Sequence, residues 1–439
     1  MVRSPVDDVP GGQNQSAFAE GDSSDKNDIQ ENDEDDEEAP LILRRRGDVI
    51  GSSQALLTLT KSFVGTGCLS IPFAWKQAGL LVAFVLQLVV SLSNWYCSLI
   101  LSRSSQRLAL QYVVNITILL YQVGCSAVPI VFMATNISKI VSEQFGSNLS
   151  QIEYASMLLV PVVAVNMIAE MRFVSWLAIT SSVLWFVGAL PLFYQCLQQP
   201  SQWQTVPLST DFWSTVMFVG TVMYAYEGQT MVLPVENKLR HPDDFIAPCG
   251  VLTTLMVLVT VIFTALGFYG YTAYGEQTKG TLSLNMPDNY LFAGVTICFI
   301  LMAFFAHPVN LYVIFDMLWP GFRRKMVTKW LPMMADHQRL LSVLFRTFWV
   351  LVTYVFAIAV PRIDSIVSLV GGTAGMLCAF VYPPLFECIT FWHEWRLAEG
   401  RRWYFFFKVT INVTLMSVGI AMIFLGLTAN IKYLPEDSA

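Results

Sequence analysis

Charge is scarce in this sequence. Of its 439 residues, 13% are Asp, Glu, Lys or Arg, whereas 54% are hydrophobic. A water-soluble domain of this size has no means of covering so much apolar surface, and uncharged runs of about 20 residues match a bilayer core of about 30 Å. The shortage of charge therefore excludes a soluble domain and predicts an all-α, polytopic membrane protein embedded in a lipid bilayer.

Patterns that carry catalysis or bind metals are also missing. The eight cysteines lie inside or at the edge of apolar runs without metal-ligand or redox spacing, and there are only four histidines. No hydrolytic constellation, phosphate-binding loop or nucleic-acid surface is present in the sequence. We therefore expect no enzyme activity, no metal, no bound cofactor and no nucleic-acid partner.

The acidic residues are concentrated at the N-terminus. Residues 1–50 hold 14 Asp and Glu against five Lys and Arg, in a segment rich in Gly, Ser, Asn and Asp without an apolar period. This composition predicts a disordered, acidic cytosolic tail over residues 1–51. It lacks the basic and apolar regions of a cleaved signal peptide, so we expect the first apolar run to act as the insertion signal.

A short sorting motif lies in this tail. Glu37 stands four residues before Leu41 and Ile42, which is the acidic dileucine pattern, and Pro40 favours an extended backbone there. We interpret Glu37, Leu41 and Ile42 as a sorting signal for a clathrin adaptor that favours the lysosomal or endosomal membrane over the plasma membrane. The alternative is that the tail is only a spacer.

Eleven apolar segments follow the tail, and they predict eleven transmembrane helices in a transporter domain over residues 52–428. A first repeat covers about 55–195, a second repeat about 211–390 and helix 11 about 403–428, leaving a short lumenal or extracellular tail at 429–439. The segments lie near 55–76, 80–102, 110–140, 153–169, 172–195, 211–234, 247–273, 290–316, 341–360, 364–390 and 403–428.

Basic residues set the predicted orientation. With the N-terminus in the cytosol, the inner loops contain clusters such as Arg44–Arg46 and Arg323–Lys325, whereas the outer loops contain few Lys or Arg. The odd number of spans then places the C-terminus in the lumen or outside the cell. Asn148 begins an Asn-Leu-Ser sequon in a short outer loop, so we expect it to be glycosylated.

Two of the predicted spans are interrupted. The first contains Gly65, Thr66 and Gly67, and the sixth contains the run Tyr224–Gly228, which includes the ionisable Glu227. Broken helices in lipid are tolerated where protein or a cavity covers the freed backbone groups. Interruptions at matching positions of two halves indicate a secondary transporter with inverted repeats, here a five-plus-five arrangement with broken helices 1 and 6. The alternative is that the glycines only allow close packing.

The chemistry of such breaks suits a zwitterion. The N-terminal end of a half-helix offers N–H groups to a carboxylate, and exposed carbonyls at the end of another hold a cation or an ammonium group. We therefore predict a substrate site formed by Gly65, Thr66, Gly67, Tyr224, Ala225, Tyr226, Glu227 and Gly228. A carboxylate within the membrane is costly unless it is used or paired, so Glu227 is either functional, paired with Lys61 or protonated.

These residues lie in stretches that resemble the proton-coupled amino acid transporters, a branch of the amino acid/auxin permease superfamily with the LeuT-like fold. The resemblance runs from about residue 52 to 428. The stretches that carry it are KSFVGTGCLSIPFAWKQAGL, GTVMYAYEGQTMVLPVENKL, GTLSLNMP, IAVPRIDSIVSLVGG and VYPPLFECITF. The resemblance implies proton-driven symport of small neutral amino acids such as glycine, alanine or proline. It places the unwound segments on the two interruptions and an acid of the eighth span on Asp316, with Phe63, Tyr224 and Tyr226 as pocket walls.

The sequence departs from the family's pattern at three places. Thr58 occupies a position where similar members carry a histidine, and a hydroxyl does not titrate near neutral pH. The linker after Arg103 is short, and only Cys196 lies near the outer face, so we expect no outer-loop disulfide. The proton-coupling candidates are therefore Glu227, His307 and Asp316, where His307 is alternatively a packing residue beside Pro308.

Two other functions stay open at this stage. One is an amino acid sensor that binds the same substrate with little flux. The other is a sodium-coupled carrier, in which Na⁺ replaces H⁺ as the coupling ion. Thr296 is the only Ser or Thr between Gly294 and Asp316, so the eighth span offers few hydroxyls for a sodium site.

Overall fold

The described part of the chain is helical. The computed structural model describes residues 51–104, 111–146, 149–168, 171–226, 228, 232–236, 239–241, 243–326, 338–360, 362–397 and 402–433, and no β-strand is found in these ranges. The helices are α2 (Ser52–Phe63), α3 (Ile71–Ala78), α4 (Leu80–Ser104), α5 (Gln111–Phe145), α6 (Gln151–Asn166), α7 (Met171–Gln198), α8 (Phe212–Ala225), α9 (Val232–Glu236), α10 (Asp243–Ile246), α11 (Val251–Tyr274), α12 (Tyr290–Lys325), α13 (Gln338–Ala359), α14 (Ile363–Val370), α15 (Tyr382–Leu397) and α16 (Arg402–Tyr433).

Eight helical segments in the described ranges are long and apolar enough to cross a membrane, and α6 and α8 are shorter apolar helices. This confirms the predicted all-α polytopic class, while the count of eleven crossings and the inverted repeat stay predictions. At 1.5 Å per residue, the 36 residues of α12 and the 32 of α16 exceed the thickness of the bilayer core.

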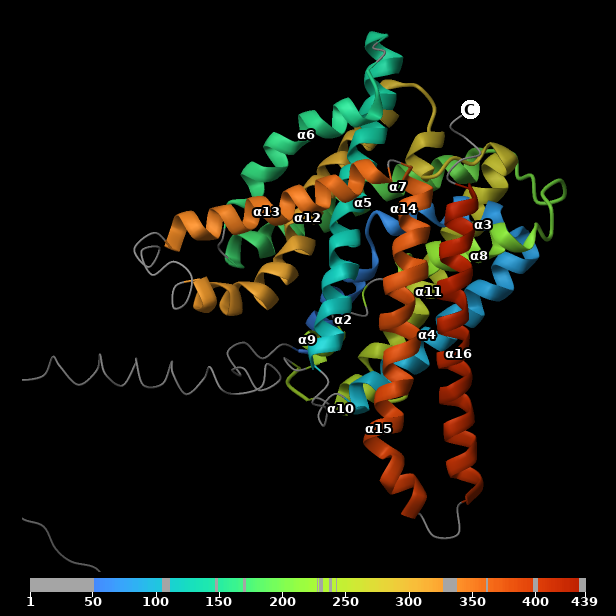
Figure 1. The fold of residues 1–439 in the computed structure, drawn as a ribbon. Coiled ribbons are helices and arrows are strands. Elements are labelled where there is room, and N and C mark those ends of the chain that lie inside the picture. The colour runs from blue at the N-terminus through green and yellow to red at the C-terminus, as the bar shows by residue number, and fades with distance from the viewer. Residues whose placement is uncertain are drawn as a thin grey trace, which may run out of the picture. The chain divides into compact units, whose positions relative to one another are not determined.

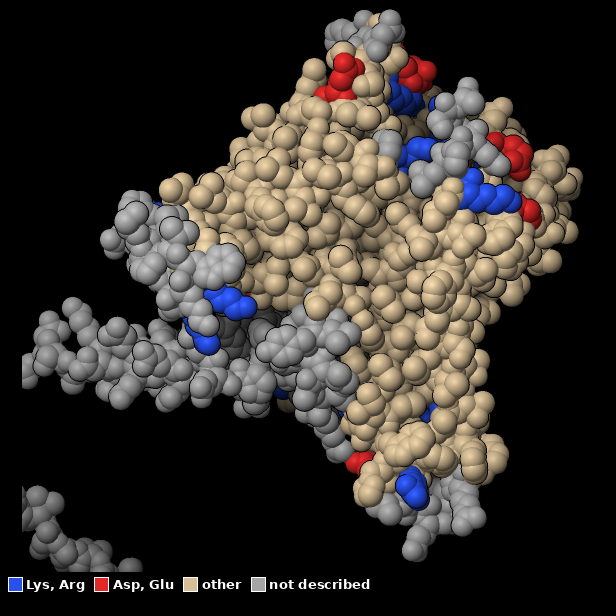
Figure 2. All heavy atoms as spheres, viewed as in Figure 1, with Lys and Arg blue, Asp and Glu red and all other residues tan. Residues whose placement is uncertain are grey.

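The surface of these helices is apolar. Leu92, Val160, Leu190 and Phe424 are each more than 60% exposed. Figure 2 shows Lys, Arg, Asp and Glu in groups separated by a broad surface without such side chains. Exposed contiguous apolar surface of this extent belongs against lipid.

The helices pack in two sets (Figure 1). The first set consists of α2, α3, α4, α8 and α11, and the second of α5, α6, α7, α12 and α13; within each set the helices pack extensively on one another. Helix α14 packs on α8 of the first set and on α5 of the second. The packing therefore brings the two predicted interruptions, in α2–α3 and α8–α9, into the same set.

The chain from α14 to α15 is not a regular α-helix. Residues Gly371–Gly375 and Leu377–Val381 are π-helical. A Cβ on Gly371 would lie 2.0 Å from the carbonyl oxygen of Gly220, so only glycine allows this approach of the segment to α8. Helix α16 follows, runs beside α15 and packs on α8, α14 and the π-helical segments.

Candidate functional site

The first predicted interruption is present. Helix α2 ends at Phe63, and Val64 is extended with φ −97° and ψ 97°. A 3₁₀ turn over Gly67–Ser70 then leads into α3, whose first turn contains Pro72. Glycine lowers helix stability, and the first turn of a helix is where proline is best tolerated, so this composition favours the end of one helix and the start of another.

The second predicted interruption is present as well. Helix α8 ends at Ala225, Tyr226 follows with φ −82° and ψ 24°, and α9 covers Val232–Glu236. Within the gap the structure describes Gly228, which is buried. Glu227 lies outside the described residues, as does the side chain of Lys61, so the predicted role of Glu227 stays a prediction.

The two interruptions touch each other through glycines. A Cβ on Gly67 would lie 2.7 Å from the ring of Tyr224 and 3.3 Å from the Cα of Ala225. A Cβ on Gly228 would lie 2.2 Å from the ring of Phe63. The glycines therefore do allow close packing, and that packing is what brings the ends of α2 and α8 together.

Tyr226 is held from several sides. Its side chain is 1% exposed, and its hydroxyl lies 3.3 Å from Nε2 of Gln87 and 3.2 Å from Oγ1 of Thr260. The ring lies edge-on to Phe63 and to Phe263, with centroid distances of 6.3 and 5.2 Å. Helices α4 and α11 thus fix the position of Tyr226, the residue that follows the end of α8.

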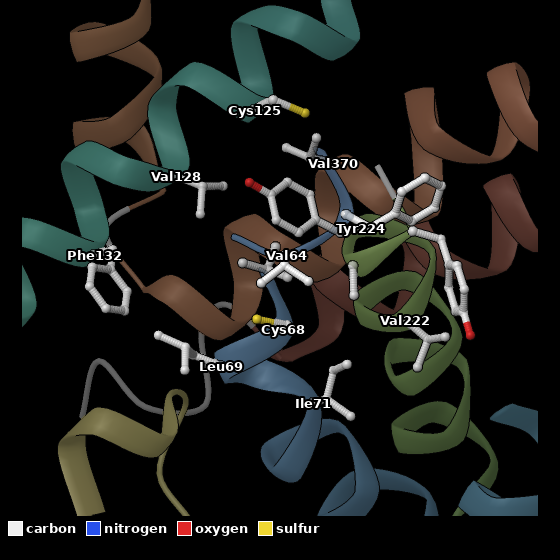
Figure 3. Packing of buried hydrophobic residues seen from close by; sticks show 14 of the residues in the cluster. Val64, Cys68, Leu69, Ile71, Cys125, Val128, Phe132, Val222, Tyr224 and Val370 are labelled. Atoms are coloured by element: carbon white, nitrogen blue, oxygen red, sulfur yellow. The ribbon is translucent and has the colours of Figure 1, made fainter. Parts of the chain in front are cut away.

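Tyr224 faces the opposite way, toward α5. Figure 3 shows its hydroxyl end directed at Val128, with Cys125 and Val370 beside the ring and Val64 below it. These neighbours are apolar and buried. The wall between the first interruption and α5 therefore carries no charged side chain among the labelled residues.

Backbone groups at the first interruption lack side-chain caps. Neither Thr66, before the 3₁₀ turn, nor Ser70, before α3, makes a side-chain capping bond. Ser70 Oγ is buried without a hydrogen-bond partner among the described residues. Cys68 Sγ donates to the carbonyl of Gly65 at 2.8 Å, and a Cβ on Gly65 would meet no atom of the described residues within 4 Å. Uncapped N–H groups beside open space form a place for an anionic group.

The structure places the other predicted residues elsewhere. His307 on α12 is fully buried, with Nδ1 3.1 Å from Asn166 of α6 and Nε2 3.4 Å from Thr353 of α13. Its hydrogen-bond partners therefore lie within the second set and not on the interrupted helices. Asp316, also on α12, is exposed. Thr58 on α2 is exposed and donates to the carbonyl of Gln54.

Several predictions fall outside the described residues. These are the sorting motif of Glu37, Leu41 and Ile42 and the glycosylation site at Asn148. All eight cysteines lie in described ranges, and none of them forms a disulfide, Cys196 included. The described residues contain no group of three or more His, Cys, Asp and Glu arranged to hold a metal ion.

Three buried acids had not been recognised in the sequence. Asp364 on α14 is 8% exposed and pairs with Arg362 at 2.8 Å. Glu236 on α9 is 9% exposed and accepts a hydrogen bond from Ser102 of α4 at 2.6 Å; Oε2 has no hydrogen-bond partner within the described ranges. Glu387 on α15 is 4% exposed and pairs with Lys408 of α16 at 3.0 Å. The available signal was an ionisable residue inside or beside an apolar span, the same signal that identified Glu227.

A cavity of about 330 Å³ lies away from the interruptions. It is formed by the end of α5 and the start of α12, and Lys139, Glu143 and Asp288 line it. Lys139 lies 3.8 Å from Glu143 and 3.6 Å from Asp288, and it donates to the carbonyls of Leu284 and Met286. Its ammonium group is thus engaged by the loop before α12. The interruptions, in contrast, are closely packed.

Comparisons with known proteins agree with this geometry. The family described as "Transmembrane amino acid transporter protein" matches residues 48–431. "Probable amino acid transporter skat-1" of Caenorhabditis elegans is 39% identical over 88% of this chain and 91% of its own. "Proton-coupled amino acid transporter-like protein pathetic" of Drosophila melanogaster is 24% identical over 90% of this chain and 87% of its own. The chain therefore belongs to the amino acid/auxin permease family of multi-pass membrane transporters, which are not enzymes.

Proposed function

We propose that this protein is a secondary active transporter that carries small neutral amino acids together with protons across the lysosomal or plasma membrane. The observation that carries the proposal is the direct contact between the two interruptions, Gly67 against Tyr224 and Gly228 against Phe63. Such paired half-helices near the membrane centre form the substrate site in transporters with broken helices.

In this site the two charges of an amino acid have separate partners. The uncapped N–H groups that follow Thr66 would bind the carboxylate, because the N-terminal end of a helix attracts anions. The carbonyls at the ends of α2 and α8 would bind the ammonium group, since the last carbonyls of a helix lack intrahelical partners. Alternating access then follows from rocking of one helix set against the other.

The walls favour a small, uncharged side chain. Where the substrate side chain would project, Val128, Val370 and Tyr224 are buried and uncharged (Figure 3). A charged side chain would lose its hydration there without gaining an oppositely charged partner, which costs several kcal/mol. The open space beside Gly65 is next to closely packed residues, and this supports glycine, alanine or proline as substrates.

Proton coupling is part of the proposal. The printed name of the Drosophila melanogaster relative describes a proton-coupled transporter-like protein, and Glu227 is the second residue after the end of α8. We assign the proton to Glu227, with His307 and Asp316 as the other candidates. The dileucine motif of Glu37, Leu41 and Ile42 supports the lysosomal or endosomal membrane. In the proposal the N-terminus lies in the cytosol, and the amino acid moves from the lumen to the cytosol.

Uptake into proteoliposomes tests the proposal. The purified full-length protein is reconstituted, and uptake of radiolabelled glycine, alanine and proline is measured with an imposed pH gradient, with and without sodium. We expect uptake that follows the proton gradient and does not require sodium. Replacement of Glu227 by Gln should abolish uptake or uncouple it from the gradient.

The same assay distinguishes the other candidate functions. Uptake that requires sodium and ignores the pH gradient would identify a sodium-coupled carrier. Saturable binding of the labelled amino acids to detergent-purified protein, without uptake, would identify a sensor. In either case proton symport would be excluded.

A further inference from the structure

A buried ionic cluster joins three helices at a distance in sequence from the interruptions. Lys408 Nζ of α16 lies 3.0 Å from Oε1 of Glu387 on α15, and Asn412 of α16 donates to Oε2 of the same carboxylate at 2.7 Å. Lys408 also donates to the hydroxyl of Tyr96 on α4 at 3.2 Å and lies 5.5 Å from its ring centroid. We call Tyr96, Glu387, Lys408 and Asn412 the ionic cluster.

The ionic cluster is nearly closed to solvent. The side chains of Lys408 and Glu387 are 14% and 5% exposed, and Asn412 is fully buried. An ion pair in an apolar span pays a large desolvation cost, and such residues are usually functional. A connection between α15 and α16 alone would need only the Glu387 carboxylate, the Lys408 ammonium group and the Asn412 amide. The bond to Tyr96 adds a third helix.

The third helix belongs to the first set. Helix α4 packs on α3, α8 and α11, and therefore on both interrupted helices. Helix α16 also packs on α8, where Tyr433 donates to Asp211, the capping residue at the start of α8, at 3.2 Å. Helices α15 and α16 are thus attached to the first set at two separated places, through α4 and through α8.

The helices that contact the chain change along the segment from α14 to α15. Helix α14 packs on α5 of the second set as well as on α8, and Val370 at its end fits against Gly124 of α5. Tyr382, the first residue of α15, bonds to Thr117 of α5. Five residues later, Glu387 accepts hydrogen bonds from Lys408 and Asn412 of α16. The π-helical segments from Gly371 to Val381 thus lie between two contacts with α5, at Val370 and at Tyr382, and the bonds to α16 follow them in the chain.

Wide helical turns are suited to bending. A π-helical turn interrupts the regular hydrogen-bond ladder, and such turns occur frequently at functional sites. In this chain two of them follow in succession beside glycines at 371, 372 and 375. A rotation of α15 relative to α14 would need only small changes in these turns.

We propose that the ionic cluster fastens α15 and α16 to α4, so that they move with the first set during transport. In this movement the bond of Tyr382 to Thr117 opens, and the π-helical segments from Gly371 to Val381 serve as the hinge to α14. Tyr96, Glu387 and Lys408 are then positioning residues for the transport step and do not touch the substrate. This inference rests on the proposed transport function and adds to it a mechanical role for α16.

The variant Tyr96→Phe tests the fastening, because it removes one hydroxyl and leaves the Lys408–Glu387 pair intact. We expect a maximal uptake rate about tenfold lower in proteoliposomes, as expected when a hydrogen bond to a charged group is lost at the rate-limiting step. The KM and the equilibrium affinity for labelled alanine should stay within about twofold of the wild type, because the binding site is untouched.

A matched control is Tyr354→Phe. The hydroxyl of Tyr354 on α13 bonds to Ser156 of α6 at 2.6 Å, so the same chemical change is made inside the second set. We expect wild-type rates from this control. Lys408→Arg, which keeps the charge, should retain much of the wild-type rate, whereas Lys408→Met combined with Glu387→Gln should lower the rate as Tyr96→Phe does while leaving affinity unchanged.

The outcomes separate the two proposals. A maximal rate in Tyr96→Phe equal to that in Tyr354→Phe, with wild-type protein active, would overturn the fastening and leave the transport function standing. A rise in KM without a change in rate would also overturn it, since that would indicate a role in substrate binding. Absence of uptake by the wild-type protein would refute the transport function itself.

Discussion

The ring of Phe63, at the end of α2, fills the space that a Cβ on Gly228 would need, at a separation of 2.2 Å. Phe63 is 2% exposed and lies edge-on to Tyr226, the residue that follows the end of α8. A glycine in one broken helix is thus matched to an aromatic residue at the end of the other. The two interruptions form one packed unit.

Gly228→Ala tests this match. The added methyl group must displace a buried ring, and overpacking of this kind costs about 1–3 kcal/mol. We expect lower thermal stability in detergent and reduced amino acid uptake. The second-site variant Phe63→Leu should recover part of the stability in a double-mutant cycle, because it restores space at the contact.

The control for Gly228→Ala is Gly294→Ala on α12, where an added Cβ meets no atom within 4 Å. This variant should be as stable as the wild type. Equal stability losses in Gly228→Ala with and without Phe63→Leu would show that the two residues do not act on each other.

Tyr226→Phe tests the support from α4 and α11. Removal of the hydroxyl takes away bonds to Gln87 and Thr260. Individual hydrogen bonds within membrane proteins contribute about 0.6 kcal/mol on average, so the melting temperature should fall slightly. Gln87→Leu combined with Tyr226→Phe should cost less than Tyr226→Phe alone, since no buried amide is left unpaired. A larger loss in the double variant would contradict this reading.

The two interruptions were predictable because their cause is local. Glycines around Thr66, a proline at position 72 and an acid within an apolar run disfavour a continuous membrane helix whatever the surroundings. The contacts that join the interruptions were not predictable. Whether Gly67 faces Tyr224 or lipid depends on helix rotation and packing, which the period of a uniformly apolar helix does not encode.

The ionic cluster shows the same limit. Glu387 and Lys408 lie in the predicted spans 364–390 and 403–428, so each was visible as an ionisable residue in an apolar run. Their pairing, and the approach of Tyr96 from α4, needs the tertiary arrangement. His307 illustrates the converse, because its position in a span suggested proton transfer while its hydrogen-bond partners Asn166 and Thr353 lie within the second set.

Lys408→Met should be strongly destabilising. It leaves the Glu387 carboxylate, which is 4% exposed, without its cation, and breaking one partner of a buried pair costs about 3–5 kcal/mol. Combining it with Glu387→Gln should restore most of the stability, since the charge is then removed with its partner. Thermal unfolding in detergent measures both. A double variant no more stable than Lys408→Met alone would argue against a direct pair.

Equilibrium binding to Gly67→Ala addresses most directly whether the substrate lies between the interruptions. Radiolabelled glycine, alanine and proline are bound to detergent-purified wild-type protein, Gly67→Ala and Gly294→Ala in a scintillation proximity assay. The added Cβ at position 67 would lie 2.7 Å from the ring of Tyr224 and push the two helix ends apart. We expect saturable binding to the wild type and to Gly294→Ala, and an affinity at least about tenfold weaker in folded Gly67→Ala. Equal affinity in all three proteins would contradict a substrate site at the paired interruptions.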